Sequence, residues 1–194
     1  MKLISVNVGL PRSVTWHDRT VTTGIFKEPV EGRVRVGLFH LEGDGQADLT
    51  VHGGRAKAVY AYPSEHYATW RDELGVPLWP WGTFGENLTV EGVLEADVHV
   101  GDRFQIGTAE LVVTQPRQPC FKLSGKLRRP EVIRHFLTST RTGWYFAVLR
   151  EGEVRAGDAI HRVALNEDAP TIAELVNDLG GGSRIRRSSA SRLP

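Results

Sequence analysis

The sequence predicts a mainly β fold, a β-barrel with a few flanking helices and a short C-terminal helical extension. Three observations predict this class. The 194 residues include 21 glycines, which separate the apolar segments from one another. These segments are short, and several have the alternating or continuous apolar patterns of strands. Many short strands at close spacing favour a closed or nearly closed barrel over alternating strands and helices.

Eight segments have strand patterns. The clearest is GRVRVGL, in which Val34, Val36 and Leu38 share one face. Arg33 and Arg35 share the other face, as expected for a half-buried strand with a period of two. A nearly continuous apolar run at 56–62 predicts a buried strand. The remaining predicted strands are 2–8, 87–91, 103–106, 110–114, 143–149 and 154–160.

Three segments have helix patterns with start or stop signals. Ser64 is a good N-cap for EHYATWRDEL, which ends near Gly75. Pro130 stands at a suitable first position for PEVIRHFLTS. Thr171 can cap IAELVNDL, and Gly180 can end that helix.

The composition is that of a soluble globular protein, with 40% hydrophobic and 24% charged residues. Lys and Arg number 24 against 23 Asp and Glu, so no strong field attracts the whole chain to nucleic acid or anionic membrane. No apolar stretch approaches the ~20 residues that span a bilayer, and no signal pattern stands at the N-terminus. A single cysteine excludes an internal disulfide. We therefore expect a cytoplasmic protein without a membrane or nucleic-acid partner.

The domain organisation changes near the C-terminus. We expect one barrel domain over 1–165 and a short helical segment over 166–180. The tail at 181–194 is rich in glycine, serine and arginine and nearly lacks large apolar residues, so we expect it to be disordered.

The strongest candidate for chemistry is Cys120, in the segment QPRQPCFK. Pro116 and Pro119 favour an extended chain on the approach to the thiol. Arg117 and Lys122 flank it, and nearby cations favour the thiolate that a metal ligand or nucleophile requires. The alternative is a buried structural cysteine.

A second candidate is the segment HGGRAK, which contains His52, Gly53, Gly54 and Lys57. Adjacent glycines can turn backbone N–H groups toward one point and form an anion site, to which the lysine adds charge. The glycine spacing and the Lys–Ser/Thr pair of a P-loop are both missing. A plain glycine turn between strands explains the segment equally well.

A third candidate is GTFGENLTV, where Glu86 and Asn87 stand at the transition from loop to strand. The amide of Asn87 offers both a donor and an acceptor to the edge of a heterocycle. Turn chemistry is the alternative. A metal site of Asp44, Asp48 and His52 is conceivable, but lone carboxylates in turns rarely bind metal, and we do not favour it.

Taken together and in order, four motifs resemble the MOSC family, named for the C-terminal domain of molybdenum cofactor sulfurases. They are GDGQADLTVHGGRAKAVYAYP at 43–63, GTFGENLTVEG at 82–92, VGDRFQIGTAELVVTQPRQPCFK at 100–122 and GWYFAVLREGEVRAGD at 143–158. The resemblance runs from about residue 1 to 165 and is closest to the stand-alone bacterial branch linked to resistance against N-hydroxylated purines.

The resemblance implies a β-barrel with one invariant cysteine, here Cys120, which in active relatives binds molybdenum held by a pterin dithiolene. It therefore implies a molybdenum cofactor, whose phosphate needs cationic and backbone donors. No pyridoxal phosphate is expected, because the chain lacks the corresponding domain of full sulfurases. The residues expected to hold this cofactor, or to lie near the pterin or substrate, are His52, Gly53, Gly54, Lys57, Glu86, Asn87, Arg117 and Lys122.

The activity that the resemblance implies is reduction of N-hydroxylated bases or related small compounds, from N–OH to N–H. Electrons would come from a flavin or haem partner protein. The alternative is a carrier module in which Cys120 bears a persulfide, or which only ferries the cofactor. The related branch adds three helices after the barrel. The C-terminal sequence here predicts only one of these helices, so 166–180 is expected to be a remnant of that module.

Overall fold

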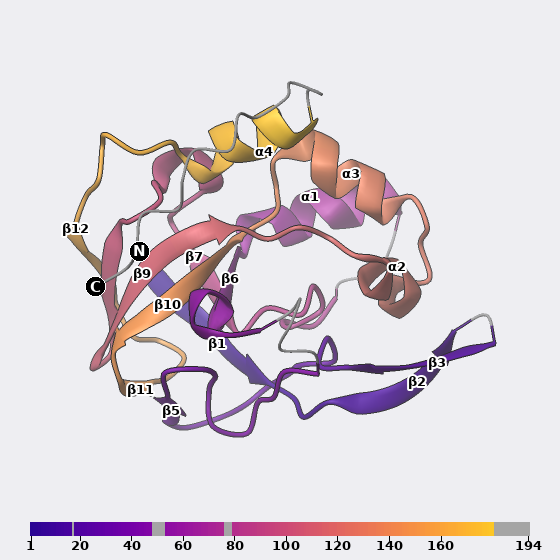
Figure 1. Cartoon of the computed structure of the whole chain (residues 1–194), viewed down its shortest axis with the longest axis horizontal. Coiled ribbons are helices and arrows are strands. Elements are labelled where there is room, and N and C mark those ends of the chain that lie inside the picture. Colours follow the sequence, from indigo (N-terminus) through magenta and orange to yellow (C-terminus); the bar gives the residue numbers. More distant parts are fainter. Residues whose placement is uncertain (17, 48–52, 76–78, 181–194) are drawn as a thin grey trace.

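The computed structural model describes residues 1–16, 18–47, 53–75 and 79–180, and its centre is an eight-stranded sheet (Figure 1). The strands of this sheet are β1 (Lys2–Val8), β4 (Glu28–Pro29), β6 (Val59–Pro63), β7 (Leu88–Glu91), β8 (Arg103–Ile106), β9 (Ala109–Pro116), β10 (Trp144–Arg150) and β12 (Ile160–Ala164). Their order is β12-β8-β9-β10-β6-β7-β1-β4. Neighbours run antiparallel except for the β6–β7 pair. The predicted mainly β class is confirmed.

Four smaller strands and the helices surround this sheet. β2 (Arg12–Trp16) pairs with β3 (Arg19–Thr23), and β5 (Val34–Val36) pairs with β11 (Gly152–Val154). The α-helices are α1 (Glu65–Leu74), α2 (Phe121–Leu127), α3 (Val132–Ser139) and α4 (Ile172–Gly180), and the 3-10 turns are η1 (Arg55–Lys57) and η2 (Glu95–Asp97). Figure 1 shows α1, α3 and α4 gathered on one side of the sheet, while the β2–β3 hairpin extends away beside α2.

The sheet curls back on itself without closing, so "barrel" describes it only loosely. Backbone bonds from Leu3 N to Asp158 O (2.9 Å) and from Ile160 N to Met1 O (3.0 Å) bring its two ends together. Between β1 and β12, however, the described chain forms one isolated bridge and no ladder. The far end of β1 turns instead to pair with β4, which leaves the sheet open.

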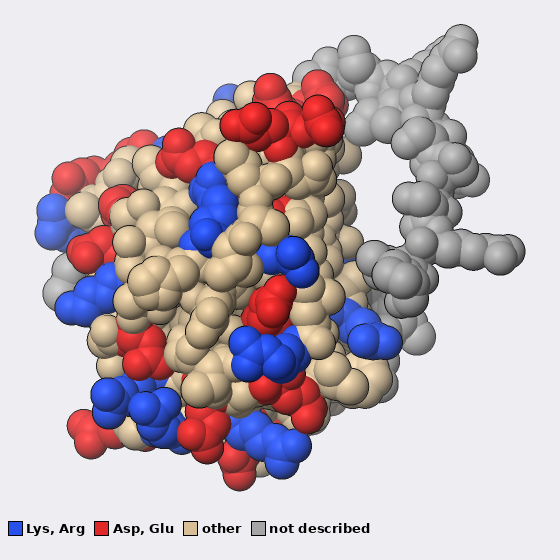
Figure 2. Space-filling view, turned by 90° about the vertical axis from the view of Figure 1, so that its left-hand side faces the viewer, with Lys and Arg blue, Asp and Glu red and all other residues tan. Residues whose placement is uncertain are grey.

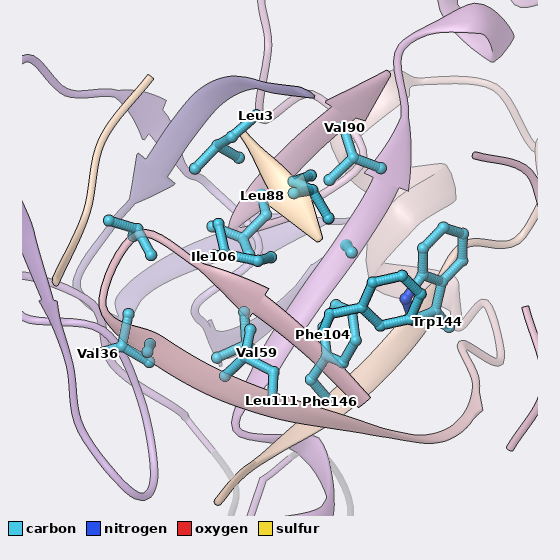
Figure 3. Close-up of a cluster of buried hydrophobic side chains, with 14 of the residues drawn as sticks. Leu3, Val36, Val59, Leu88, Val90, Phe104, Ile106, Leu111, Trp144 and Phe146 are labelled. Atoms are coloured by element: carbon cyan, nitrogen blue, oxygen red, sulfur yellow. The ribbon is translucent and has the colours of Figure 1, made fainter. Parts of the chain in front are cut away.

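Strand β6 is buried on both faces, which explains its continuous apolar sequence. Val59 and Ala61 belong to the cluster inside the curled sheet, shown in part in Figure 3. Tyr60 and Tyr62 point the other way, into a second, aromatic cluster under α1, α2 and α3. That second cluster includes the stacked rings of Trp70 and Phe136, whose centroids are 5.0 Å apart. One strand therefore joins two cores by simple alternation.

The predicted helices are present with small changes at their ends. Gly75 ends α1 in the left-handed conformation, with φ of 60°. Ser64 precedes α1, but its side chain makes no capping bond. Helix α3 begins at Val132, two residues after Pro130. At α4, Thr171 Oγ1 accepts from the Glu174 N–H at 3.1 Å, so the predicted cap is made.

Three features differ from the sequence prediction. The segment 154–160 is a turn around Gly157 that joins the end of β11 to the start of β12. The β2–β3 hairpin was not predicted, because its polar threonines and arginines mask the alternation of Val14, Trp16 and Val21. Helix α2, directly after Cys120, was also not predicted.

The surface and the C-terminal segment add two observations. Acidic and basic side chains are interspersed over much of the face in Figure 2, in keeping with the balanced composition. Helix α4 buries Ile172 and Val176 against the rest of the fold. The predicted disordered tail at 181–194 lies outside the described residues. No helix in the described ranges is both long and apolar enough to cross a membrane.

We predict that Gly143→Ala destabilises the fold far more than Gly75→Ala. Both glycines have left-handed backbones, with φ of 64° and 60°. A Cβ at Gly143 would lie 2.3 Å from the carbonyl oxygen of Ala61, whereas none of the described atoms lies within 4 Å at Gly75. The shared backbone strain costs about 1 kcal/mol, and the clash adds about 2 kcal/mol more. Urea unfolding measures both losses, and equal losses would contradict the close approach of β6 to the turn before β10.

Candidate functional site

A pocket of about 100 Å³, open to solvent, lies where the end of β9, the start of α2 and the β2–β3 hairpin meet the 43–47 loop. Four polypeptide segments bring a thiol, cations and one carboxylate to its wall. The polar and ionisable side chains that line it are Thr23, Lys27, Asp44, Gln46, Lys57, Tyr60, Asn87, Arg117, Cys120, Lys122 and Tyr145.

Cys120 stands at the junction of strand and helix. Strand β9 ends at Pro116, and Cys120 is the N-cap of α2 in an extended conformation, with φ of −126° and ψ of 168°. Its carbonyl accepts the Leu123 N–H at 2.9 Å, which starts the helix. The residue is partly buried and lines the pocket, so the alternative of a sealed structural cysteine does not fit this geometry.

Arg117 is a buried cation with an unused donor. Its residue is 6% exposed, and Nη1 has no hydrogen-bond partner among the described residues. The guanidinium carbon lies 5.3 Å from the centre of the Tyr60 ring. Burial works against its charge, but Tyr60, Tyr145 and Cys120 together raise the Arg117 pKa above its usual value. Because a buried N–H without a partner is costly, this atom is suited to donate to an anion in the pocket.

A buried ion pair forms the opposite wall. Lys27 Nζ pairs with Asp44, and the two side chains are 8% and 3% exposed. Asp44 also accepts from the Gly9 N–H at 3.0 Å and from Asn87 Nδ2 at 2.8 Å. Burial lowers the pKa of Lys27, although the charge of Asp44 opposes that change. The sequence contains no motif around Lys27 that would have indicated this role.

Asn87 is engaged by the protein on both sides of its amide. Its Nδ2 donates to Asp44 and to the Asn7 carbonyl (3.3 Å), and its Oδ1 accepts from the Tyr60 N–H at 3.1 Å. Both donors are therefore used, and only one acceptor position on Oδ1 is left. The side chain lines the pocket, but in this geometry it orients Asp44 rather than presenting a free amide edge.

Glu86 lies in the protein interior and does not line the pocket. It is 0% exposed and accepts from the N–H groups of Gly82 (2.8 Å) and Phe84 (3.1 Å) and from the hydroxyl of Tyr67. Burial raises its pKa, and these hydrogen bonds oppose that rise. The contacts show that Glu86 holds the loop before β7 in place, and they give no support to a contact with cofactor or substrate.

The predicted anion site of the HGGRAK segment is only partly visible. His52 and Asp48 lie outside the described residues. The Gly54 N–H donates to Gln46 Oε1 at 3.1 Å, and neither Gly53 nor Gly54 lines the pocket. Lys57 does line it, at the end of η1. The structure therefore brings the lysine of this motif, but not its glycines, to the wall beside Cys120.

Lys122 connects the pocket to the hairpin, because its Nζ donates to the Thr22 carbonyl at 3.3 Å. Of the residues proposed from sequence, the pocket thus unites Lys57, Asn87, Arg117, Cys120 and Lys122. Among the described residues, no group of three His, Cys, Asp or Glu side chains could hold a metal ion.

Comparison with known proteins identifies the family. Residues 48–161 match the MOSC domain. The uncharacterized protein YflK of Bacillus subtilis is 42% identical over 165 residues, which are 85% of this chain and 74% of that protein. The chain therefore belongs to the MOSC domain family, and the resemblance drawn from its sequence motifs is confirmed.

Its relatives YflK and YiiM are stand-alone bacterial proteins. Protein YiiM of Escherichia coli is 35% identical over 148 residues, covering 75% of this chain and 66% of YiiM. The crystal structure of YiiM from Geobacillus stearothermophilus has a TM-score of 0.76 at 37% identity and covers 92% of this chain and 83% of that one. A Gibberella moniliformis protein named Reductase is 34% identical over 143 residues, but the match spans only 25% of its length.

Protonation of Lys126 makes the stability of the fold depend on pH. From α2, its Nζ donates to the carbonyl oxygens of Ile25 (2.9 Å) and Gly82 (2.8 Å). Burial lowers the Lys126 pKa to about 8, although the charge of Glu86 opposes this. The unfolded chain keeps this proton up to pH 10.5, its ordinary pKa. Between these two values the unfolded state binds more protons, so this group makes the free energy of unfolding rise with pH.

We predict that the wild type gains stability relative to Lys126→Met as the pH rises from about 7.5 to about 9.5. Methionine does not titrate, so the difference between the two proteins isolates the lysine. Urea unfolding of both at intermediate pH values measures it. A difference that is flat or falls across this window is incompatible with the lowered pKa.

Proposed function

We propose that this chain binds a molybdenum cofactor through Cys120 and reduces N-hydroxylated bases or related small compounds. The observation that carries the proposal is the partly accessible thiol in a pocket that also contains Lys57, Arg117 and Lys122. Membership of the MOSC family supports the type of cofactor. A flavin or haem protein is proposed as the source of electrons.

The residues fit such a group chemically. A thiolate is a soft ligand, a type suited to redox metals. The cofactor is anionic. Nη1 of the buried Arg117 has no hydrogen-bond partner among the described residues, so it can donate to an anion in the pocket. When bound, the cofactor would supply the two-electron chemistry, while the chain fixes its position and access.

The protein's own contribution to the reaction is positioning and proton supply. Converting N–OH to N–H and water consumes two electrons and two protons. Lys27 Nζ is the group proposed to hold one of these protons, because it lines the pocket and its pKa is lowered by burial. A lowered pKa brings an ammonium group closer to the operating pH, where it is a better acid. Asp44 keeps Nζ in place through the ion pair.

We predict that Cys120→Ser, expressed in a host that makes the cofactor, retains its fold and loses molybdenum. The measurement is the molybdenum-to-protein ratio by plasma mass spectrometry, with pterin determined by fluorescence. Arg117→Gln should lower both ratios, and Arg103→Gln, a charge loss at an exposed position on β8, should not. Full molybdenum occupancy in Cys120→Ser would end the assignment. A sulfur adduct on wild-type Cys120 without molybdenum would favour the carrier function.

We predict that the double variant Lys27→Met/Asp44→Asn slows reduction by about 10²-fold or more per bound molybdenum, the range typical for loss of a general acid. Removing both charges avoids leaving one of them unpaired. The assay is reduction of 6-N-hydroxylaminopurine with an artificial electron donor, scored as kcat and KM across pH. The wild-type rate should fall at high pH, and the variant should lack this fall. An unchanged kcat would refute the proton role.

A further inference from the structure

A second cavity lies beside α2, the helix that begins directly after Cys120. It is a groove between the β2–β3 hairpin and α2, and its walls include Trp16 and Val21 from the hairpin and Phe121 and Gly125 from the helix. Phe121 directly follows Cys120, so the groove begins one residue from the thiol. Lys122 ties the helix to the hairpin through its bond to the Thr22 carbonyl. The groove and the pocket therefore share the same two elements.

The walls of the groove are aromatic and incompletely covered. Phe121 is 59% exposed, and its ring stands edge-on to that of Trp16, with 6.5 Å between the centroids. A Cβ at Gly125 would lie 2.7 Å from Cδ2 of Trp16, so only glycine lets the indole lie against the helix. Two accessible aromatic rings at right angles form a platform on which a planar ring can stack.

Two arginines also line the groove. Arg19 lies directly opposite Trp16 in the hairpin, and Arg128 ends α2. Both are exposed, and within the described ranges neither guanidinium has an ion-pair partner. Among the residues that the structure describes, no acidic side chain lines the groove. Arg128 is held at the end of α2 as its C-cap, with a left-handed backbone (φ of 53°) and its N–H donating to the Ser124 carbonyl.

From this combination we propose that the groove binds a planar heteroaromatic ring that carries a phosphate group, as in a nucleoside monophosphate. The ring would stack on the exposed face of Phe121 with its edge toward Trp16, and the phosphate would bind Arg19 and Arg128. Guanidinium groups bind phosphate through paired N–H donors, and the absence of an acidic lining residue favours an anion. If the proposed reductase function holds, on which this step rests, the substrate would be an N-hydroxylated nucleotide rather than the free base.

The test uses the full chain and follows tryptophan fluorescence during titration with AMP, adenosine and inorganic phosphate. AMP should bind at least tenfold more tightly than adenosine, and phosphate alone more weakly than AMP. Arg19→Gln/Arg128→Gln should reduce AMP affinity to that of adenosine and leave adenosine binding unchanged. The control is Arg33→Gln/Arg103→Gln, which removes two exposed arginines that do not line the groove and should leave both affinities unchanged.

Phe121→Ala should weaken AMP and adenosine binding by the same factor, because it removes only stacking. Equal affinity for AMP and adenosine, or no effect of the double arginine variant, would overturn the proposal. A single-stranded oligothymidylate that binds more than tenfold tighter than AMP would also overturn it, in favour of strand binding.

The proposed nucleotide groove and the proposed cofactor site can be refuted independently. Cys120→Ser should bind AMP normally even though it loses molybdenum. Cys120-dependent molybdenum without AMP binding would overturn the groove alone. AMP binding of the expected pattern in a protein whose molybdenum content does not depend on Cys120 would overturn the proposed function alone and leave the nucleotide site standing.

Discussion

The rest of the site depends on the contacts of one buried carboxylate, that of Asp44. It pairs with Lys27 and accepts hydrogen bonds from Gly9 and Asn87, so it joins segments that are far apart in the chain. Both charged side chains are nearly buried. Removing one partner of such a pair typically costs about 3–5 kcal/mol, because the other charge stays in a medium of low dielectric. This wall of the pocket is therefore held by electrostatics as much as by apolar packing.

The two-sided burial of β6 sets the rest of the geometry. Its inward side chains complete the cluster inside the sheet, where Phe104 and Phe146 meet edge-on with centroids 5.8 Å apart (Figure 3). Its outward Tyr60 belongs to the aromatic cluster and lies beneath the guanidinium of Arg117. Strand β6 thus supports a buried cation with an unused donor, and this gives the pocket a positive charge near Cys120.

Much of the fold was predictable because its strands have strong local patterns. The alternation in 32–38 and the apolar run before Pro63 are local signals, and both segments contain strands. The hairpin was missed because its polar residues mask its alternation, and α2 was missed because it is short and depends on tertiary contacts, with Leu123 buried in the aromatic cluster and Gly125 against the indole of Trp16. Among the site residues, the cations near Cys120 were predicted because they are close to it in the sequence. Lys27 was not, since its partner Asp44 is 17 residues away.

By itself, the sequence determined the mainly β class, the MOSC family and the single thiol between cations and prolines, because each of these depends on residue types at short spacing. Only the tertiary structure decided that Glu86 is an interior residue, that Asn87 orients Asp44, and that the sheet stays open. Those outcomes depend on which distant groups share a buried space. Burial and hydrogen-bond competition between distant segments leave no trace in local sequence patterns.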